Sequence, residues 1–194
     1  MTIAKGLEGI EVDETAISLV EGTLGRLSYR GIPLDTLVTW PFSRVVWLVV
    51  NGDEPDDVAL RAFEEELAAA APLSVRDREL LDLLATRPMH PMQVMVAMTT
   101  AFEHVPGSFE RYGEAAKGFT IAARLTSTIG YLLAKCTGKA LPHACTTLNP
   151  VERLLHGIGV AKNTELAHAM EVTQILQIEH SFNAGTFAAR ARAR

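Results

Sequence analysis

The chain has 194 residues, 48% of them hydrophobic, and its 18 basic and 23 acidic side chains leave a net charge of −5. This length and hydrophobic content suit a folded domain with a substantial core and exclude a disordered chain. The acidic balance argues against nucleic-acid binding, and the longest apolar run, residues 45–50, is far shorter than the roughly 20 residues of a membrane helix. No secretory signal is visible and the two cysteines form no CxxC pair, so we expect a cytoplasmic protein without membrane or nucleic-acid partners.

The first thirty residues have the alternating pattern of β-strands. Apolar and polar side chains alternate over residues 10–12 and again over residues 27–29, and Glu21-Gly22 interrupts the chain between them. This pattern predicts a small antiparallel N-terminal hairpin.

The rest of the chain has helical periodicity, with apolar residues three or four positions apart. At least seven helices are expected, within residues 34–38, 44–50, 55–67, 77–84, 91–102, 109–137, 150–155 and 164–179. The fold class is therefore predicted to be mainly α, with one small β-hairpin.

Several residues are typical of helix ends. The expected N-terminal caps are Ser43, Ser74 with Asp77, Asn149 and Asn163. The expected C-terminal stops are Asn51-Gly52 and Gly138. The acidic run of residues 64–66 is expected to be a solvated helix face.

The chain has no phosphate-binding glycine loop and no GxSxG motif, so its six histidines are the remaining candidates for chemistry. His156, His168 and His180 are spaced by 12 residues, but 12 steps rotate a helix by about 120°, so they do not share a face. We therefore expect no zinc site there. His90 is interpreted as a capping or packing residue at a helix start.

His180 stands where an apolar helix runs into small polar residues. A histidine in that position can be held neutral as a general acid or hydrogen-bond donor, or it can be an ordinary structural histidine. The residues alone leave both interpretations open. Cys136 and Cys145 are expected to be small buried fillers, and the arginines of residues 190–194 a solvated tail.

Segments throughout the chain resemble bacterial citrate synthases, in the order in which that family has them. They are residues 5–10, 14–18, 25–32, 42–55, 90–92 and 179–190. The last reads Glu-His-Ser-Phe-Asn-Ala-Gly-Thr-Phe-Ala-Ala-Arg and is similar to the family's catalytic-histidine segment, His-Ala-(Asp/Glu)-His-(Gly/Glu)-Phe-Asn-Ala-Ser-Thr.

The resemblance implies a mainly helical fold of a large and a small domain that forms a homodimer across stacked helices. It implies the acyl transfer of the tricarboxylic acid cycle, a Claisen-type condensation of an acyl-coenzyme A, usually acetyl-CoA, with a 2-oxo acid, usually oxaloacetate. No metal is implied, and no cofactor besides the coenzyme A thioester that is the substrate. The segment match implies that His180 is catalytic, as the donor that stabilises the enol oxygen. A second histidine, in a Gly-Pro-x-His-Gly-Gly motif, and an aspartate base complete the family's chemistry.

Neither of those two further groups is found in this sequence. Residues 1–194 are therefore expected to be one N-terminal region of the large domain, with the small domain and C-terminal half absent and no activity alone. Val151-Glu152-Arg153 also stands where the family usually has Ala-Asn-Phe near the 2-oxo acid pocket, and Gln177, Ser181 and Gly185 differ from the histidine segment.

Three interpretations remain open. The chain is one component of a split or paired synthase, a non-catalytic structural or regulatory dimerisation module, or a fragment of an ordinary synthase. The acyl-CoA and the 2-oxo acid are not identified by the sequence.

Overall fold

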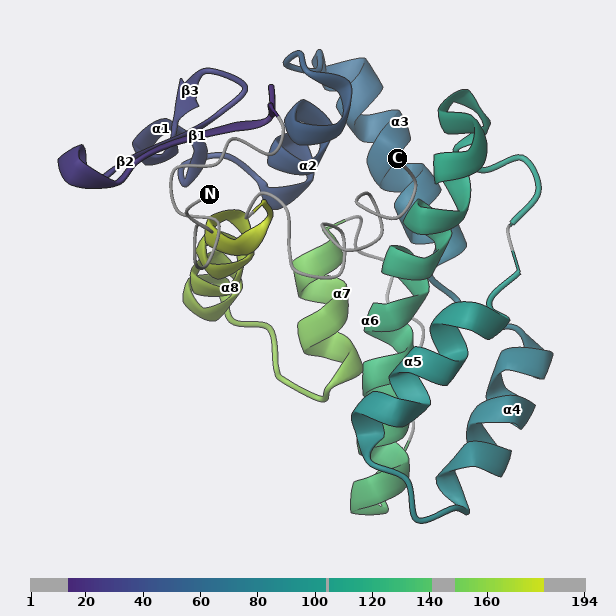
Figure 1. The fold of residues 1–194 in the computed structure, drawn as a ribbon. Helices are drawn as coiled ribbons and strands as arrows, with labels where there is room; N and C mark the ends of the chain where they lie inside the picture. The colour runs from purple at the N-terminus through teal and green to yellow at the C-terminus, as the bar shows by residue number, and fades with distance from the viewer. Residues whose placement is uncertain (1–13, 104, 141–148, 180–194) are drawn as a thin grey trace, which may run out of the picture.

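The computed structural model describes residues 14–103, 105–140 and 149–179, and it is built mainly of helices (Figure 1). A small sheet lies at one end beside α1, α2 and α8, α4 and α5 lie at the other end, and α6 and α7 lie between them. The strands and 3-10 helices are β1 (Ser18–Glu21), η2 (Gly22–Leu24), β2 (Arg26–Tyr29), β3 (Ile32–Pro33) and η3 (Glu110–Ala115). The α-helices are α1 (Leu34–Leu37), α2 (Phe42–Asn51), α3 (Asp57–Ala70), α4 (Val75–Ala85), α5 (Pro91–Ala101), α6 (Ala116–Thr137), α7 (Pro150–Gly157) and α8 (Thr164–Gln177). The predicted mainly α fold is confirmed.

The sheet has three antiparallel strands in the order β1-β2-β3. Ser18 pairs with Tyr29 in the first ladder, and Tyr29 pairs with Ile32 in the second. The predicted hairpin exists, but the partner of β2 is residues 18–21, and the strand expected at residues 10–12 lies outside the described part of the chain. Glu21 ends β1, as the interruption at Glu21-Gly22 indicated.

Most predicted helix starts are confirmed, because the caps act on backbone groups only two or three residues away. Ser74 accepts from the Asp77 amide at 3.1 Å while the Asp77 carboxylate accepts from the Ser74 amide at 2.8 Å, which is a complete capping box. Asn149 accepts from the amides of residues 151 and 152, and Asn163 from that of residue 166. His90 caps α5 through Nδ1, which accepts from the Met92 amide at 3.2 Å.

Three predicted helix starts are wrong. The helix expected from residue 55 begins at Asp57, because the Asp56 carboxylate accepts from the Ala59 amide at 2.7 Å and caps it. Ser43 does not cap α2: the helix begins at Phe42, two residues earlier than expected, and the buried Ser43 hydroxyl donates to the Glu64 carboxylate instead. The long helix does not begin at Phe109, because Phe109 and Gly113 have φ of 56° and 54° and the intervening turn is 3-10. The α6 helix begins at Ala116 and ends before Gly138, whose φ of 67° confirms the predicted stop.

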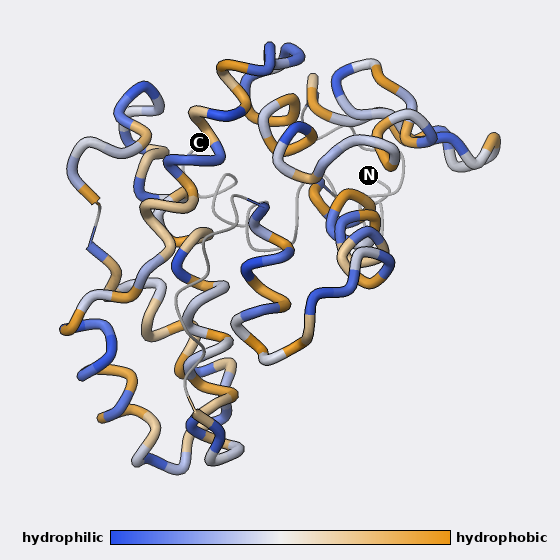
Figure 2. Tube along the Cα trace, turned by 180° about the vertical axis from the view of Figure 1, so that it is seen from behind, coloured by the Kyte–Doolittle hydropathy of each residue, from blue (hydrophilic) through white to orange (hydrophobic). Residues whose placement is uncertain are grey.

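The core consists of clusters on both sides of α6. Figure 2 shows hydrophobic and hydrophilic residues alternating along the helices. An aromatic cluster joins α2, α3, η3 and α6, in which the Phe63 ring is 5.6 Å from the Trp47 ring and 5.7 Å from the Phe119 ring. A second cluster joins α4, α5 and α6. A third, the sheet cluster, joins the sheet and α1 to α2 and α8 and consists of Tyr29, Leu37, Val45, Leu48 and Ile175, with partly buried neighbours.

Helices α6 and α7 cross at two glycines. A Cβ added to Gly130 would stand 2.7 Å from the carbonyl carbon and 3.0 Å from the Cα of Gly157, so the crossing has no room for a side chain. Because α7 also packs on α8, this contact connects α6 to the helix that leads toward residue 180.

We therefore expect Gly130→Ala to destabilise the chain by about 1–3 kcal/mol, because the added methyl group would force two backbones apart. Gly118→Ala is the matched control on the same helix: nothing lies within 4 Å of its added Cβ, and replacing a helical glycine there should stabilise by about 0.5–1 kcal/mol. Urea unfolding followed by circular dichroism measures both. Equal stability of the two variants would contradict the close crossing.

Candidate functional site

The residue that the sequence singles out for catalysis, His180, lies outside the described residues. The structure does describe the helix that leads to it: α8 ends at Gln177, and Ile178 and Glu179 follow. Ser181, Gly185 and the arginines of residues 190–194 also lie outside the described part of the chain.

The C-terminal turn of α8 is held from the opposite end of the sequence. The Tyr29 hydroxyl, on β2, donates to the carbonyl oxygens of Ile175 at 3.2 Å and Leu176 at 3.5 Å. Tyr29 and Ile175 are both fully buried. Burial raises the pKa of the Tyr29 phenol, and the nearby negative charge of Glu179 raises it further, so the phenol stays a neutral donor at ordinary pH.

Helix α7 runs antiparallel beside α8 and brings a second predicted segment to the same end (Figure 1). The Asn149 side chain joins the two helices, because its Oδ1 caps α7 while its Nδ2 donates to Glu171 Oε1 at 2.8 Å. Val151 and Arg153 are buried on α7, and Val151 belongs to one hydrophobic cluster with Leu155 and with Ala167 of α8. The segment that departs from the family pattern therefore begins at the end of the helix pair where α8 leads to residue 180.

The other histidines take no part in a common site among the described residues. His90 is the α5 cap already given, and His156 and His168 are exposed on different helices. Within residues 14–103, 105–140 and 149–179, no group of three His, Cys, Asp or Glu could hold a metal ion. Cys136 is exposed rather than a buried filler, because it lies on an uncovered face near the end of α6, and Cys145 lies outside the described residues.

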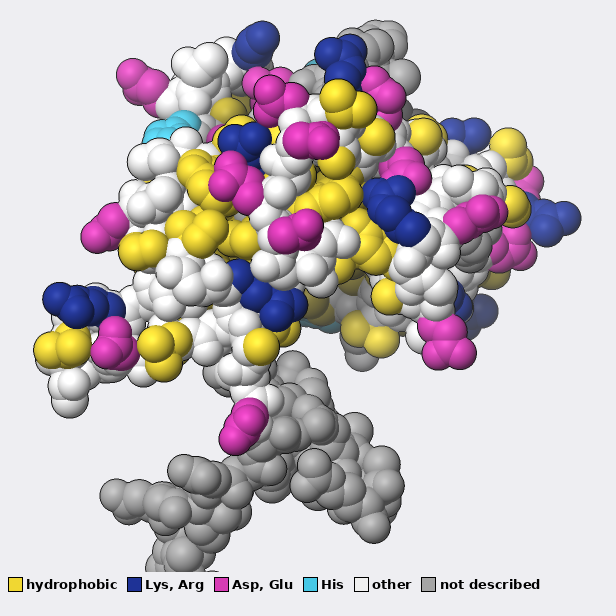
Figure 3. Space-filling model, turned by 90° about the horizontal axis from the view of Figure 1, so that it is seen from above, with side chains coloured by type: hydrophobic (Ala, Val, Ile, Leu, Met, Phe, Trp, Pro, Cys, Tyr) yellow, Lys and Arg dark blue, Asp and Glu magenta, His cyan; other side chains and the backbone are white. Residues whose placement is uncertain are grey.

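The sequence predicted that the acidic residues 64–66 form a solvated helix face. The structure shows that two of them make contacts with neighbouring elements. Glu64 accepts from Ser43, and Glu66 pairs with Arg111 at 2.7 Å, which ties α3 to α2 and η3. Of the three, only Glu65 is exposed, and it pairs with Arg61 on the same helix at 3.1 Å. Figure 3 shows charges of both signs interspersed over the upper face, without an extended patch of one sign.

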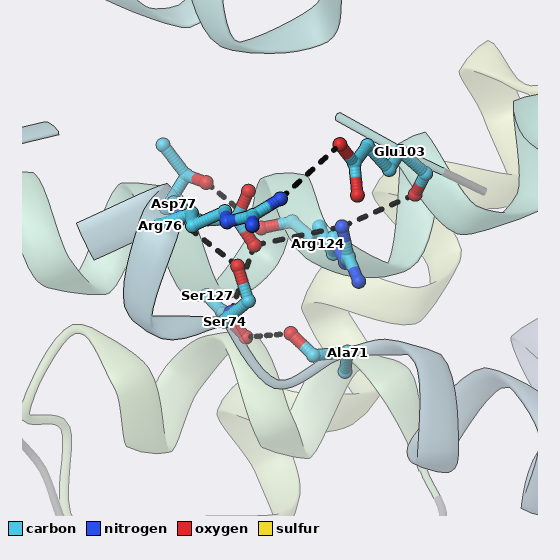
Figure 4. A network of polar contacts seen from close by, with 8 residues as sticks. Ala71, Ser74, Arg76, Asp77, Glu103, Arg124 and Ser127 are labelled. Atoms are coloured by element: carbon cyan, nitrogen blue, oxygen red, sulfur yellow. Dashed lines mark hydrogen bonds and ion pairs between the residues drawn. The ribbon is translucent and has the colours of Figure 1, made fainter. Parts of the chain in front are cut away.

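A buried ion pair that sequence reasoning missed joins α4 to α6, and its arginine also contacts the segment after α5 (Figure 4). Arg124 Nη1 on α6 lies 3.5 Å from Asp77 Oδ2 and donates to the Glu103 carbonyl oxygen at 3.2 Å, with both charged side chains about nine-tenths buried. Asp77 is thus both the capping-box residue of α4 and the partner of Arg124. The one available signal was an arginine within the apolar periodicity of residues 115–133. The pair holds α4, α6 and the end of α5 together and is structural.

None of the helices that the structure describes has the length and apolar content to cross a bilayer.

Comparison with known proteins supports the resemblance. The family model described as citrate synthase, C-terminal domain, matches residues 6–193. The chain is 34% identical to the 2-methylcitrate synthase of Mycobacterium tuberculosis and 31% identical to the citrate synthase of Mycolicibacterium smegmatis, in each case over 97% of this chain. The citrate synthase of Thermotoga maritima superposes on 97% of the chain with a TM-score of 0.81 at 27% identity. This chain spans about half the length of each: 48%, 51% and 50%.

We expect Asp77→Asn to destabilise the chain by about 3 kcal/mol, because it leaves the buried Arg124 without its countercharge. Arg76→Ala is the control: Arg76 is 86% exposed, 4.0 Å from Glu103, and its loss should cost at most about 0.5 kcal/mol. Denaturant unfolding compares them, and a cost for Asp77→Asn no greater than that of the control would show that the pair does not join the helices.

Proposed function

Because the chain belongs to the citrate synthase family, we propose that it is one part of an acyl-CoA condensing enzyme of the citrate or 2-methylcitrate synthase type. The observation that carries this is the family match over residues 6–193, which includes the His180 segment that continues from the anchored α8. The reaction removes a proton from the carbon next to the thioester and adds that carbon to the carbonyl of a 2-oxo acid, whose oxygen takes up a proton. Water then hydrolyses the thioester and releases the free thiol of coenzyme A. His180 takes part as a hydrogen-bond donor to a substrate oxygen.

The chain works only together with the family groups that it does not carry. It spans about half the length of its curated relatives, and the Gly-Pro-x-His-Gly-Gly motif is not in the sequence. A positioned acid or base is worth on the order of 10²–10⁴ in rate, so lacking two of them reduces the chain alone to background turnover.

A citrate-synthase-like segment that supplies those groups is therefore part of the proposal, and a second copy of the chain, which lacks the same groups, can contribute only a dimer contact. Exposed apolar side chains on α5 and α6 support association: Met92 and Val96 are each 62% exposed, and Ile129 and Leu133 about 40%. Light scattering that gives the mass of a single chain at micromolar concentration would argue against the second copy.

A non-catalytic dimerisation module is the second candidate. Arg153, a charged residue, is buried on α7 within the segment that departs from the family pattern beside the 2-oxo acid pocket. Such a change fits a pocket that no longer receives its substrate.

The test mixes the chain with the half of the M. tuberculosis 2-methylcitrate synthase that this chain does not match. Free thiol release from acetyl-CoA or propionyl-CoA with oxaloacetate is followed. We expect the chain alone to stay at the no-enzyme blank and the mixture to turn over, with His180→Gln reducing the mixture's rate about 10²- to 10⁴-fold.

His168→Gln is the matched control, because His168 is exposed on α8, and it should leave the rate of the mixture unchanged. Turnover by the chain alone well above the blank would contradict its dependence on a second half. Halves that co-purify without turnover would favour the non-catalytic module.

A further inference from the structure

The end of strand β2 contacts the C-terminal ends of two helices at once. Tyr29 donates to the carbonyls of Ile175 and Leu176 on α8, and the next residue, Arg30, donates from Nε and Nη2 to the Val49 carbonyl of α2 at 3.2 and 2.9 Å. The last four carbonyls of a helix lack their usual partner within the helix, so they are free to accept such contacts; the Ile175 carbonyl also accepts from the Ile178 amide at 3.4 Å.

The backbone at this point is specialised for the double contact. Arg30 has φ of 49°, which is unusual for a residue with a side chain, and its amide bonds to the Ile17 carbonyl at 2.7 Å. This conformation turns the chain sharply between β2 and β3 and directs neighbouring side chains to different helices. Gly52, which ends α2, has the Arg30 guanidinium within 4 Å of its added Cβ position, so the arginine lies directly against the end of that helix.

The Tyr29 contact is the one that bears on the active-site segment. Its hydroxyl reaches across 146 positions of sequence to the last turn of α8, only four and five residues before His180. Ile175, whose carbonyl receives the hydrogen bond, is itself fully buried in the sheet cluster, so the turn is fixed on both its polar and its apolar side.

We propose that Tyr29 is a positioning residue for His180: its hydroxyl holds the last turn of α8, which ends three residues before the histidine in the sequence. This rests on the proposed function only for the role of His180, and the contact itself can be tested without any turnover.

The variant Tyr29→Phe removes one oxygen atom and keeps the ring in the sheet cluster. The matched control is Tyr131→Phe, because Tyr131 is also buried and its hydroxyl donates at 2.8 Å to Asp82, on helices other than α8. Two readouts are taken on the intact chain: amide hydrogen exchange along α8 and the imidazole signals in histidine NMR, with the His180 signal identified by its loss in His180→Gln.

We expect Tyr29→Phe to speed exchange in residues 175–178 about five- to tenfold, the size of one hydrogen bond, without speeding it in residues 168–171. We also expect it to move the His180 imidazole signal, while Tyr131→Phe does neither. Unchanged exchange and an unmoved His180 signal would overturn the proposal. So would equal changes in both variants, uniform acceleration along the whole chain, or loss of the folded far-UV spectrum, because each shows a general rather than a positioning role.

The same measurements separate this inference from the proposed function. A chain that gives no turnover with any second half, yet shows the local response at residues 175–178 and His180, loses the synthase proposal and keeps the positioning contact. A chain that turns over and shows no such response keeps the synthase proposal and loses the role of Tyr29.

Discussion

The close approach of α6 to α7 at Gly130 and Gly157 is the contact on which the rest of the arrangement depends. Helix α6 carries the aromatic cluster on one side and the α4–α5 cluster on another, while α7 carries α8. Because the backbones of α6 and α7 touch at the two glycines, van der Waals contact fixes the distance between α6 with its clusters and α7 with α8. The sheet then connects to the assembly through α2 and α8, because Tyr29 and Ile175 belong to one buried cluster.

This arrangement explains how the C-terminal turn of α8 is held in a defined position. Three polar contacts fix how the helices lie against one another, which hydrophobic packing alone would leave less defined. They are Arg124 with Asp77 between α6 and α4, Asn149 between α7 and α8, and Tyr29 at the end of α8. Each satisfies a group that is buried or stands at a helix end, where an unpaired polar group is costly. The positioning role proposed for Tyr29 depends on the last of them, because it acts on the turn that precedes His180.

Local sequence signals predicted much of the fold. They failed where the start of a helix depends on a residue distant in the sequence or on an unusual backbone conformation. Ser74, Asn149 and Asn163 were read correctly because a cap involves backbone amides two or three residues away. Ser43 has the same local sequence pattern as these caps, yet its hydroxyl donates a hydrogen bond to the Glu64 carboxylate. Phe109 continues the helical periodicity, but the left-handed Phe109 and Gly113 delay α6 to Ala116. At the site, resemblance identified the His180 segment, whereas no pattern could show that Tyr29 reaches α8.

The central claim is that the described helices and sheet form one cooperative unit through α6, α7 and α8. Trp40 packs against the sheet cluster and Trp47 against the aromatic cluster, so tryptophan fluorescence reports both sides while far-UV circular dichroism reports the helices. Equilibrium unfolding in urea followed by both signals tests the claim most directly. The account predicts a single transition with the same midpoint and slope for the two probes. Separate midpoints, or a fluorescence change that precedes the loss of helix, would show that the sheet and α8 are not fixed to α6 and would contradict it.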